Sequence, residues 1–203
     1  MKQNPVRIIS ISSLVLFFLL VYFMSYESFV NTIDQWVYEQ TRNVGHTTIL
    51  SMSVVTQLMS KTMILVFSIG VTLLLVLRKK STRAMLFLGT MAGSALITIL
   101  AKIVFQRQRP ILGFVEESGY SFPSGHALFS VVFFFLTFLL LKDTINTCVQ
   151  KVAFITSIVL VTLIGASRVI LGVHWFSDVI AGYALGTVLL TLIMLLHQKK
   201  MKL

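Results

Sequence analysis

The chain has 203 residues, of which 56% are hydrophobic and only 12% are charged, against roughly 25% charged residues in an average soluble domain. This composition excludes an ordinary soluble protein and predicts an integral membrane protein with a single domain over residues 1–203. The net charge of +10 comes mostly from short clusters between apolar runs. Because these clusters form no basic stripe interleaved with aromatic residues, we expect no nucleic-acid partner.

Several apolar runs reach the length of about 20 residues that a helix needs to cross a bilayer. We place the spans at about 6–26, 57–77, 84–105, 124–141, 151–170 and 178–197. The first run follows Lys2 and Arg7 and so resembles a signal peptide, but it is long and no small-x-small cleavage site follows it. We therefore expect an uncleaved first helix and an all-α fold, a bundle of six transmembrane helices.

The segment from Glu27 to Ser60 is too polar to span a membrane. Apolar residues such as Ile33 and Trp36 recur in it at helical spacing, opposite a polar face that includes Asp34. This pattern predicts an amphipathic helical segment between the first two spans. The segment either lies at the outer membrane interface, with Trp36 at headgroup depth, or forms a lid packed on protein, and the pattern leaves both open.

Two pairs of glycines, Gly89 with Gly93 and Gly182 with Gly186, are spaced four apart within predicted spans. This spacing lets two helices approach each other closely. We interpret both pairs as packing seams inside the monomer and not as contacts between copies.

The basic residues are divided unevenly between the two sides of the predicted bundle. Eleven of the seventeen, including the groups at 78–83 and 199–202, fall on the side that holds both termini. Six of the seven acids fall on the other side. The positive-inside rule then places both termini in the cytoplasm, and it places three polar clusters at the outer face.

The first polar cluster, Lys102-x6-Arg109-Pro110, begins in the outer end of the third span. Residues seven apart in an α-helix share a face, so Lys102 and Arg109 should point the same way and Arg107 elsewhere. Pro110 disfavours a helical conformation at Arg109, so we expect the helix to end there. The two cations are suited to binding an anion together. Taken alone, the pair is better explained by cations that snorkel at a membrane boundary.

The second cluster, Ser124-Gly125-His126, follows Pro123 and opens the fourth span. A helix N-terminus offers unpaired N–H groups and a positive dipole end to phosphate oxygens. Gly125 lets the backbone approach such a ligand, Ser124 can donate a hydrogen bond, and His126 lies beside it. Taken alone, the cluster also fits an ordinary helix cap with an interfacial histidine.

The third cluster is Arg168-x5-His174-x3-Asp178. His174 and Asp178 are four apart, so a helical turn would bring them into contact. A carboxylate bonded to one ring nitrogen fixes the tautomer and leaves the other nitrogen free to attack. Arg168, at the outer end of the fifth span, can bind two phosphate oxygens. A structural His–Asp pair is the alternative, but ionisable residues near a membrane are by default functional.

Few acidic side chains lie near these clusters. Glu116 and Glu117 precede the second cluster, where they either repel unwanted anions or simply solvate the loop, and we favour the second. The sequence offers no cage of paired carboxylates for a metal ion, and Lys102, Arg109 and Arg168 supply positive charge in its place. We therefore expect neither a metal nor a cofactor.

Together these residues match the three-part signature of the type 2 phosphatidic acid phosphatase family, which the chain resembles from Lys102 to Asp178. The resemblance implies that His174 is the nucleophile of a phosphohistidine intermediate and that Asp178 orients it. It also implies that His126 protonates the leaving oxygen and later activates water. The residues that it assigns to binding the phosphoryl group are Lys102, Arg109, Ser124, Gly125 and Arg168.

The resemblance further implies a metal-independent membrane phosphatase that removes phosphate from a lipid phosphomonoester or pyrophosphate. The short build is similar to bacterial members, which favours undecaprenyl pyrophosphate or phosphatidylglycerophosphate, with phosphatidic acid as a further candidate. Two alternatives stay open: phosphoryl transfer to a lipid or sugar acceptor at the same site, and non-catalytic binding or transport of lipid phosphates or other anions. The expected partners are the lipid phosphate substrate and membrane lipid, and no obligate protein partner is implied.

Overall fold

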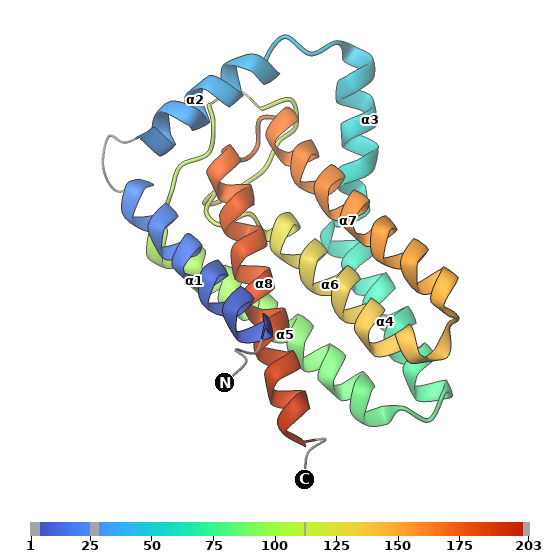
Figure 1. Ribbon diagram of the computed structural model, residues 1–203. Coiled ribbons are helices and arrows are strands. Elements are labelled where there is room, and N and C mark those ends of the chain that lie inside the picture. Colours follow the sequence, from blue (N-terminus) through green and yellow to red (C-terminus); the bar gives the residue numbers. More distant parts are fainter. Residues whose placement is uncertain (1–4, 25–28, 112, 201–203) are drawn as a thin grey trace.

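The computed structural model describes residues 5–24, 29–111 and 113–200, and every regular element in these ranges is a helix (Figure 1). In chain order the elements are α1 (Pro5–Met24), α2 (Phe29–Thr41), α3 (His46–Gln57), α4 (Lys61–Leu77), α5 (Ser81–Phe105), α6 (Gly125–Leu141), the 3-10 turn η1 (Lys142–Thr144), α7 (Thr147–Ile170) and α8 (Phe176–Lys200). The prediction of an all-α fold is confirmed. Lys2 and Lys202, which contribute to the charge count, and the predicted end of the first span at 25–26 lie outside the described residues.

Five helices, α1, α5, α6, α7 and α8, are each long and apolar enough to cross a membrane. The helices α3 and α4 together are long and apolar enough to make a sixth span. They are bent by 42° at the short break between them, so they count as one span only if the bend is allowed. After the break, Ser60 caps α4 by accepting a hydrogen bond from the N–H of Met63 at 3.3 Å. The predicted bundle of membrane helices is confirmed, with the second span made by α3 and α4 when the pair is counted as one. In that case α3 belongs to a span, although it lies in the segment that we expected to be too polar to cross.

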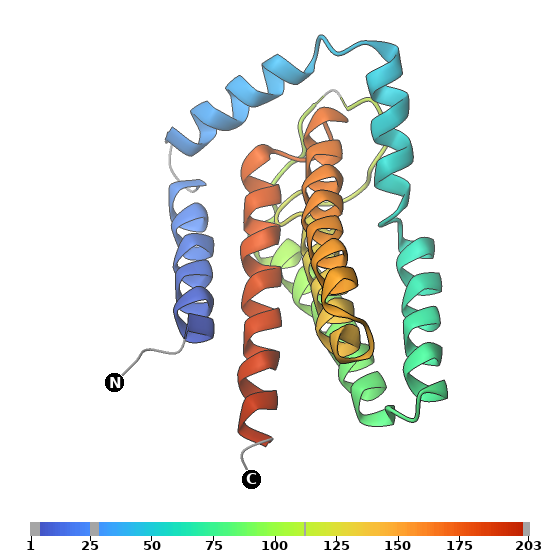
Figure 2. The ribbon, with the colours of Figure 1, turned by 45° about the vertical axis from the view of Figure 1, so that its right-hand side comes forward.

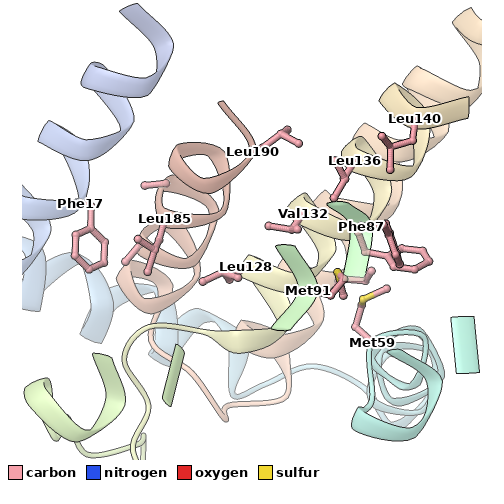
Figure 3. Close-up of a cluster of buried hydrophobic side chains, with 14 of the residues drawn as sticks. Phe17, Met59, Phe87, Met91, Leu128, Val132, Leu136, Leu140, Leu185 and Leu190 are labelled. Atoms are coloured by element: carbon pink, nitrogen blue, oxygen red, sulfur yellow. The ribbon is translucent and has the colours of Figure 1, made fainter. Parts of the chain in front are cut away.

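The spans pack around α8, which is the most enclosed of them. It runs along both α1 and α6, while α5 and α7 flank α6 (Figures 1 and 2). Large apolar side chains fill the spaces between these helices, among them Phe17, Leu128, Leu136 and Leu185 (Figure 3). Many other large apolar side chains are exposed on the outer faces, as expected where hydrocarbon is the solvent.

The close approach of α8 to α6 depends on two glycines. A Cβ at Gly182 would lie 2.5 Å from the carbonyl oxygen of Ser124, and one at Gly186 would also lie too close to the α6 backbone. The predicted seam inside the monomer is confirmed for this pair. A Cβ at Gly89 or Gly93 would meet nothing within 4 Å, so the prediction of a second seam is wrong.

The helix α2 crosses one end of the bundle and contacts α7 and α8 (Figure 1). The predicted amphipathic helix is therefore present, and it packs on protein along one side. Its orientation differs from the prediction, because Asp34 is only 1% exposed whereas Trp36 is 61% exposed. The placement of Asp34 on an outward polar face is wrong, since this carboxylate turns inward to an ion pair with Arg107.

The two ends of the bundle carry different parts of the sequence. The start of α1 and the end of α8 lie opposite α2, together with the basic turn at 78–80 and the turn at 142–146 (Figures 1 and 2). The end of α5, the start of α6, the end of α7 and the start of α8 lie beneath α2. The fold therefore gathers all three polar clusters at one end of the bundle.

Candidate active site

The segment between α5 and α6, residues 106–124, has no regular structure in its described part and links the first cluster to the second. The helix α5 ends at Phe105, because Gln106 adopts a left-handed conformation with a φ of 46°. The N–H of Ser121 then donates to the carbonyl of Arg107 at 2.8 Å, which folds the segment back on itself. The predicted end of the span at 105 is confirmed, but the argument from Pro110 that the helix continues to Arg109 is wrong, and Arg109 reaches the site from a loop.

Lys102 and Arg109 nevertheless converge, because both are held by the same part of this loop. The Nζ of Lys102, in the last turn of α5, donates to the carbonyl of Tyr120. The guanidinium of Arg109 reaches that carbonyl at 3.4 Å. It also donates to the carbonyls of Gly119 at 2.9 Å and Val173 at 2.6 Å. Arg109 thereby ties the loop before α6 to the segment before α8.

The second cluster forms the start of α6, as predicted. Ser124 is fully buried and caps the helix, with its Oγ accepting from the N–H of Ala127 at 3.5 Å. The N–H of Ser124 donates to the carbonyl of Asp178 at 3.0 Å, which joins the second cluster to the third. His126 lies half-buried in the first turn of α6, and its side chain makes no hydrogen bond with any other described residue. Its ring is therefore available to a ligand.

His174 lies just before α8 and is 3% exposed. Its Nδ1 is 3.4 Å from Oδ2 of Asp178, which also accepts the N–H of Trp175 at 2.9 Å. The predicted contact is confirmed, although it forms at the irregular start of α8 and not across a complete helical turn. The other ring nitrogen, Nε2, faces Nη1 of Arg109 at 3.3 Å. Because a guanidinium only donates, Nε2 carries the lone pair and the Nδ1 proton points to Asp178.

The imidazole of His174 is neutral near pH 7. Burial lowers the pKa of His174 to about 4, and the opposing effect of Asp178 does not offset it. In the part of the chain that the structure describes, no three His, Cys, Asp or Glu side chains are grouped so that they could hold a metal ion. The positive charges that act on His174 are those of Arg168 and Arg109.

Arg168, in the last turn of α7, is 2% exposed and divides its guanidinium between two partners. Its Nη1 donates to Oγ1 of Thr56 at 2.7 Å, and its Nη2 donates to Oε1 of Glu117 at 2.5 Å. Its Nε is buried without a hydrogen-bond partner among the described residues. A buried donor without an acceptor is costly, so this nitrogen marks a place where an anionic ligand would be stabilised.

Glu117 lies in the site instead of merely solvating the loop, so the prediction for this residue is wrong. Its second carboxylate oxygen is 3.9 Å from Arg109, and its first is bonded to Arg168. Burial alone would raise the pKa of Glu117, but the charge and hydrogen bond of Arg168 outweigh it and lower the pKa. The ionised carboxylate thus occupies guanidinium groups that are suited to phosphate.

Sequence reasoning also missed Arg107 and Asp34. The Nη1 of Arg107 donates to Oδ1 of Asp178 at 2.6 Å, and its Nη2 donates to Oδ2 of Asp34 at 2.7 Å. The expectation that Arg107 points away from the site is therefore wrong. The one available signal was that Arg107 is a cation on the acid-rich side without a place in the three clusters.

The chain was compared with known families and structures. A model of the PAP2 superfamily matches residues 83–202, which is more than half of the chain. The chain belongs to the PAP2 superfamily. This membership bears out the resemblance that the three clusters indicated.

Two curated proteins and one solved structure are similar to the chain. It is 33% identical over 118 residues to phosphatidylglycerophosphatase B of Bacillus subtilis, covering 57% of this chain and 58% of that protein. It is 32% identical over 109 residues to an uncharacterised 22.5 kDa protein in the cps region of Klebsiella pneumoniae, covering 52% of each. The matched regions thus span little more than half the length of these relatives.

The solved structure is the first transmembrane PAP2 type phosphatidylglycerolphosphate phosphatase from Bacillus subtilis. It superposes with a TM-score of 0.88, is 24% identical, and covers 94% of this chain and 96% of that one. This likeness shows that the two chains share the fold of a transmembrane helical bundle. The chain is accordingly a multi-pass membrane protein of the PAP2 superfamily.

Proposed function

We propose that the chain is a metal-independent membrane lipid phosphatase, one domain over residues 1–203, that works through a phosphohistidine at His174. One observation carries the proposal. A neutral imidazole is held by Asp178 with its Nε2 facing Arg109, and the buried Arg168, whose charge also acts on His174, has an Nε without a partner among the described residues. An oriented nucleophile in a site that also holds buried cations, one of them with an unpartnered donor, is what phosphoryl transfer requires.

The chemistry divides into two steps. In the first, Nε2 of His174 attacks phosphorus, the bond to the lipid oxygen breaks, and His126 gives its proton to the leaving oxygen. In the second, water gives a proton to His126 and attacks phosphorus, and the phosphorus–nitrogen bond breaks to release inorganic phosphate. Asp178 stabilises the positive charge that forms on His174 in the first step.

The phosphoryl oxygens would be bound by the cations and the start of α6. Nη1 of Arg109 now lies 3.3 Å from Nε2 of His174, so Arg109 would shift to let the phosphorus in and then bind its oxygens. Increased negative charge on these oxygens in the transition state would strengthen their bonds to the donors. The residues that we assign to this role are Lys102, Arg109, Ser124, Gly125 and Arg168.

The charge distribution supports an outward-facing site with both termini in the cytoplasm. The site lies at the α2 end of the bundle, whereas the basic turn at 78–80 lies at the other end (Figure 2). A phosphate site at headgroup depth meets lipid phosphates by lateral diffusion, so we infer a lipid substrate and no obligate protein partner. Undecaprenyl pyrophosphate and phosphatidylglycerophosphate are the favoured candidates, and the name of the Bacillus subtilis relative supports the second.

The deciding experiment is phosphate release from a panel of lipid phosphates by the purified protein in liposomes, with and without EDTA. We expect turnover of at least one lipid, retained in EDTA, and its loss in His174→Ala. His46→Ala, at an exposed histidine at the start of α3, is the matched control and should keep full activity. Binding of a lipid phosphate without turnover would contradict a phosphatase and favour a binding or transport protein. Transfer of label to an added alcohol instead of water would favour a phosphotransferase.

A further inference from the structure

The carboxylate of Asp34 is built into the start of α8, although it belongs to α2. Its Oδ1 accepts the N–H of Ser177 at 2.8 Å, and its Oδ2 accepts the Ser177 hydroxyl at 2.5 Å. The same Oδ2 accepts Nη2 of Arg107 at 2.7 Å. The side chain is 1% exposed, so none of these bonds is shared with bulk solvent. The buried carboxylate is therefore held by three hydrogen bonds from within the protein.

Arg107 connects this carboxylate to the one beside His174. Its Nη1 donates to Oδ1 of Asp178 at 2.6 Å, and its guanidinium lies 5.5 Å from the ring centre of Trp175. The Arg107 side chain is 15% exposed and that of Asp178 is 0% exposed. Asp34, Arg107 and Asp178 therefore form one buried chain of ion pairs, which ends at Nδ1 of His174 and which we call the Asp34 network.

The Asp34 network fixes the plane of the Asp178 carboxylate. Its Oδ1 is taken by Arg107, and its Oδ2 is directed to Trp175 N–H and His174 Nδ1. Without Arg107 the carboxylate could rotate and exchange its oxygens. With Arg107 but without Asp34, the cation would be balanced by Asp178 alone and would draw that carboxylate away from His174. Two carboxylates around one guanidinium leave Asp178 able to hold the imidazole.

Stability is a weak reason for such an arrangement. Burying charged groups costs free energy that their attraction repays only when the geometry is good, and apolar replacements are often as stable. A role in positioning His174 explains why the ion pairs of the Asp34 network lead to its imidazole. Neither Asp34 nor Arg107 bonds a residue to which we assign phosphate binding, so their effect should reach phosphate only through His174.

We propose that Asp34 and Arg107 are positioning residues for His174, and that α2 thereby forms part of the active site. The inference rests on the proposed function only in assigning the nucleophile. It predicts that changing Asp34 or Arg107 weakens the binding of orthovanadate but leaves the affinity for inorganic phosphate nearly unchanged, although both ligands are anions of similar charge. Under the proposed function, inorganic phosphate would contact the cations and the start of α6, whereas orthovanadate can also accept Nε2 of His174 as a fifth ligand and mimic the transition state.

The test compares Asp34→Asn with wild type by binding of inorganic phosphate and of orthovanadate, and by kcat and KM on the lipid substrate. We expect kcat to fall by about ten- to a hundredfold, since small misplacements of a catalytic group have effects of this size. Vanadate should bind correspondingly more weakly, while KM and the phosphate affinity stay within about twofold of wild type. Glu39→Gln removes the same charge from an exposed position of the same helix and should change none of these values.

Arg107 provides the second arm. Arg107→Gln should likewise weaken vanadate binding without weakening phosphate binding. Arg107→Lys should restore part of the vanadate affinity, because the ammonium keeps the charge but reaches fewer acceptors. Adding Asp34→Asn to Arg107→Gln should cause no further loss, as expected for residues that act through one another. This arm also decides the matter if Asp34→Asn does not fold.

The outcomes separate this inference from the proposed function. If wild type turns over no lipid phosphate, the function is wrong, but the vanadate-to-phosphate comparison still tests the positioning role. If Asp34→Asn and Arg107→Gln keep wild-type vanadate affinity, the positioning role is refuted and the phosphatase stands. Equal weakening of phosphate and vanadate, or failure of both variants to fold, would show a structural role only and would also refute it.

Discussion

Glu117→Gln should increase the affinity of the site for inorganic phosphate. In the structure the Glu117 carboxylate bonds Nη2 of Arg168 at 2.5 Å and lies 3.9 Å from Nη2 of Arg109. A phosphate oxygen would need the same donors, so an incoming phosphate has to displace this carboxylate. Glutamine keeps the shape and one hydrogen-bond acceptor but loses the charge that competes.

The size of the effect follows from the contact. Two unit charges about 4 Å apart interact by roughly 4 kcal/mol at an effective dielectric constant of about 20, which is an upper bound. The Glu117 side chain is 31% exposed, and a glutamine amide would keep part of the hydrogen bond to Arg168. The substitution should therefore remove only about 1.4 kcal/mol of the free energy with which Glu117 competes with phosphate. That free energy corresponds to about a tenfold fall in the inhibition constant of inorganic phosphate.

The assay is product inhibition of lipid phosphate hydrolysis by added inorganic phosphate at fixed ionic strength. Glu116→Gln is the matched control, since it removes the same charge from the neighbouring exposed position and should leave the inhibition constant unchanged. An unchanged or higher inhibition constant in Glu117→Gln would refute competition, because the carboxylate would then be neutral toward phosphate or would help to bind it.

Three further predictions follow from the site and its surroundings. Because burial lowers the pKa of His174 to about 4, the acid limb of kcat/KM should lie well below the ordinary 6.5, and a limb at 6.5 would contradict a neutral buried nucleophile. In a chain whose native cysteine is replaced, a cysteine at Ser118 should react with an impermeant maleimide in intact cells and one at Ser81 only after permeabilisation; the opposite pattern would turn the site inward. Gly182→Ala places a Cβ 2.5 Å from the carbonyl oxygen of Ser124, so it should lower the melting temperature and the activity, whereas alanine at the α5 glycines should not.

The spans and the local contacts were predictable because they depend on short-range patterns. Apolar runs of span length mark five of the membrane helices directly. The contact of His174 with Asp178 follows from a separation of four residues, and the start of α6 at Gly125 follows from a polar cluster before an apolar run. Each of these rules needs only neighbouring residues.

The remaining contacts depend on how distant segments meet. Glu117 is 51 residues from Arg168, and Asp34 is 73 residues from Arg107, so no periodicity relates the members of either pair. The position of Arg109 was also not predictable. The helix α5 ends at Phe105 because Gln106 is left-handed, and not at Arg109, where Pro110 was expected to end it. An acid on an amphipathic helix is read as solvent-facing unless its partner is known, and here the partner lies on another element.

The internal acceptors of the three cations have a consequence for product release. Lys102 is bonded to loop carbonyls, Arg109 to four backbone carbonyls, and Arg168 to Thr56 and Glu117. At the donors that already have partners, a phosphate that enters the site would only exchange one acceptor for another, and a new bond would be gained only at Nε of Arg168, which has no partner among the described residues. A lipid substrate has its chains in the bilayer to keep it near the site, but free phosphate has no such anchor. When phosphate left, the protein's own acceptors would return to the cations, and this return would favour release of the product.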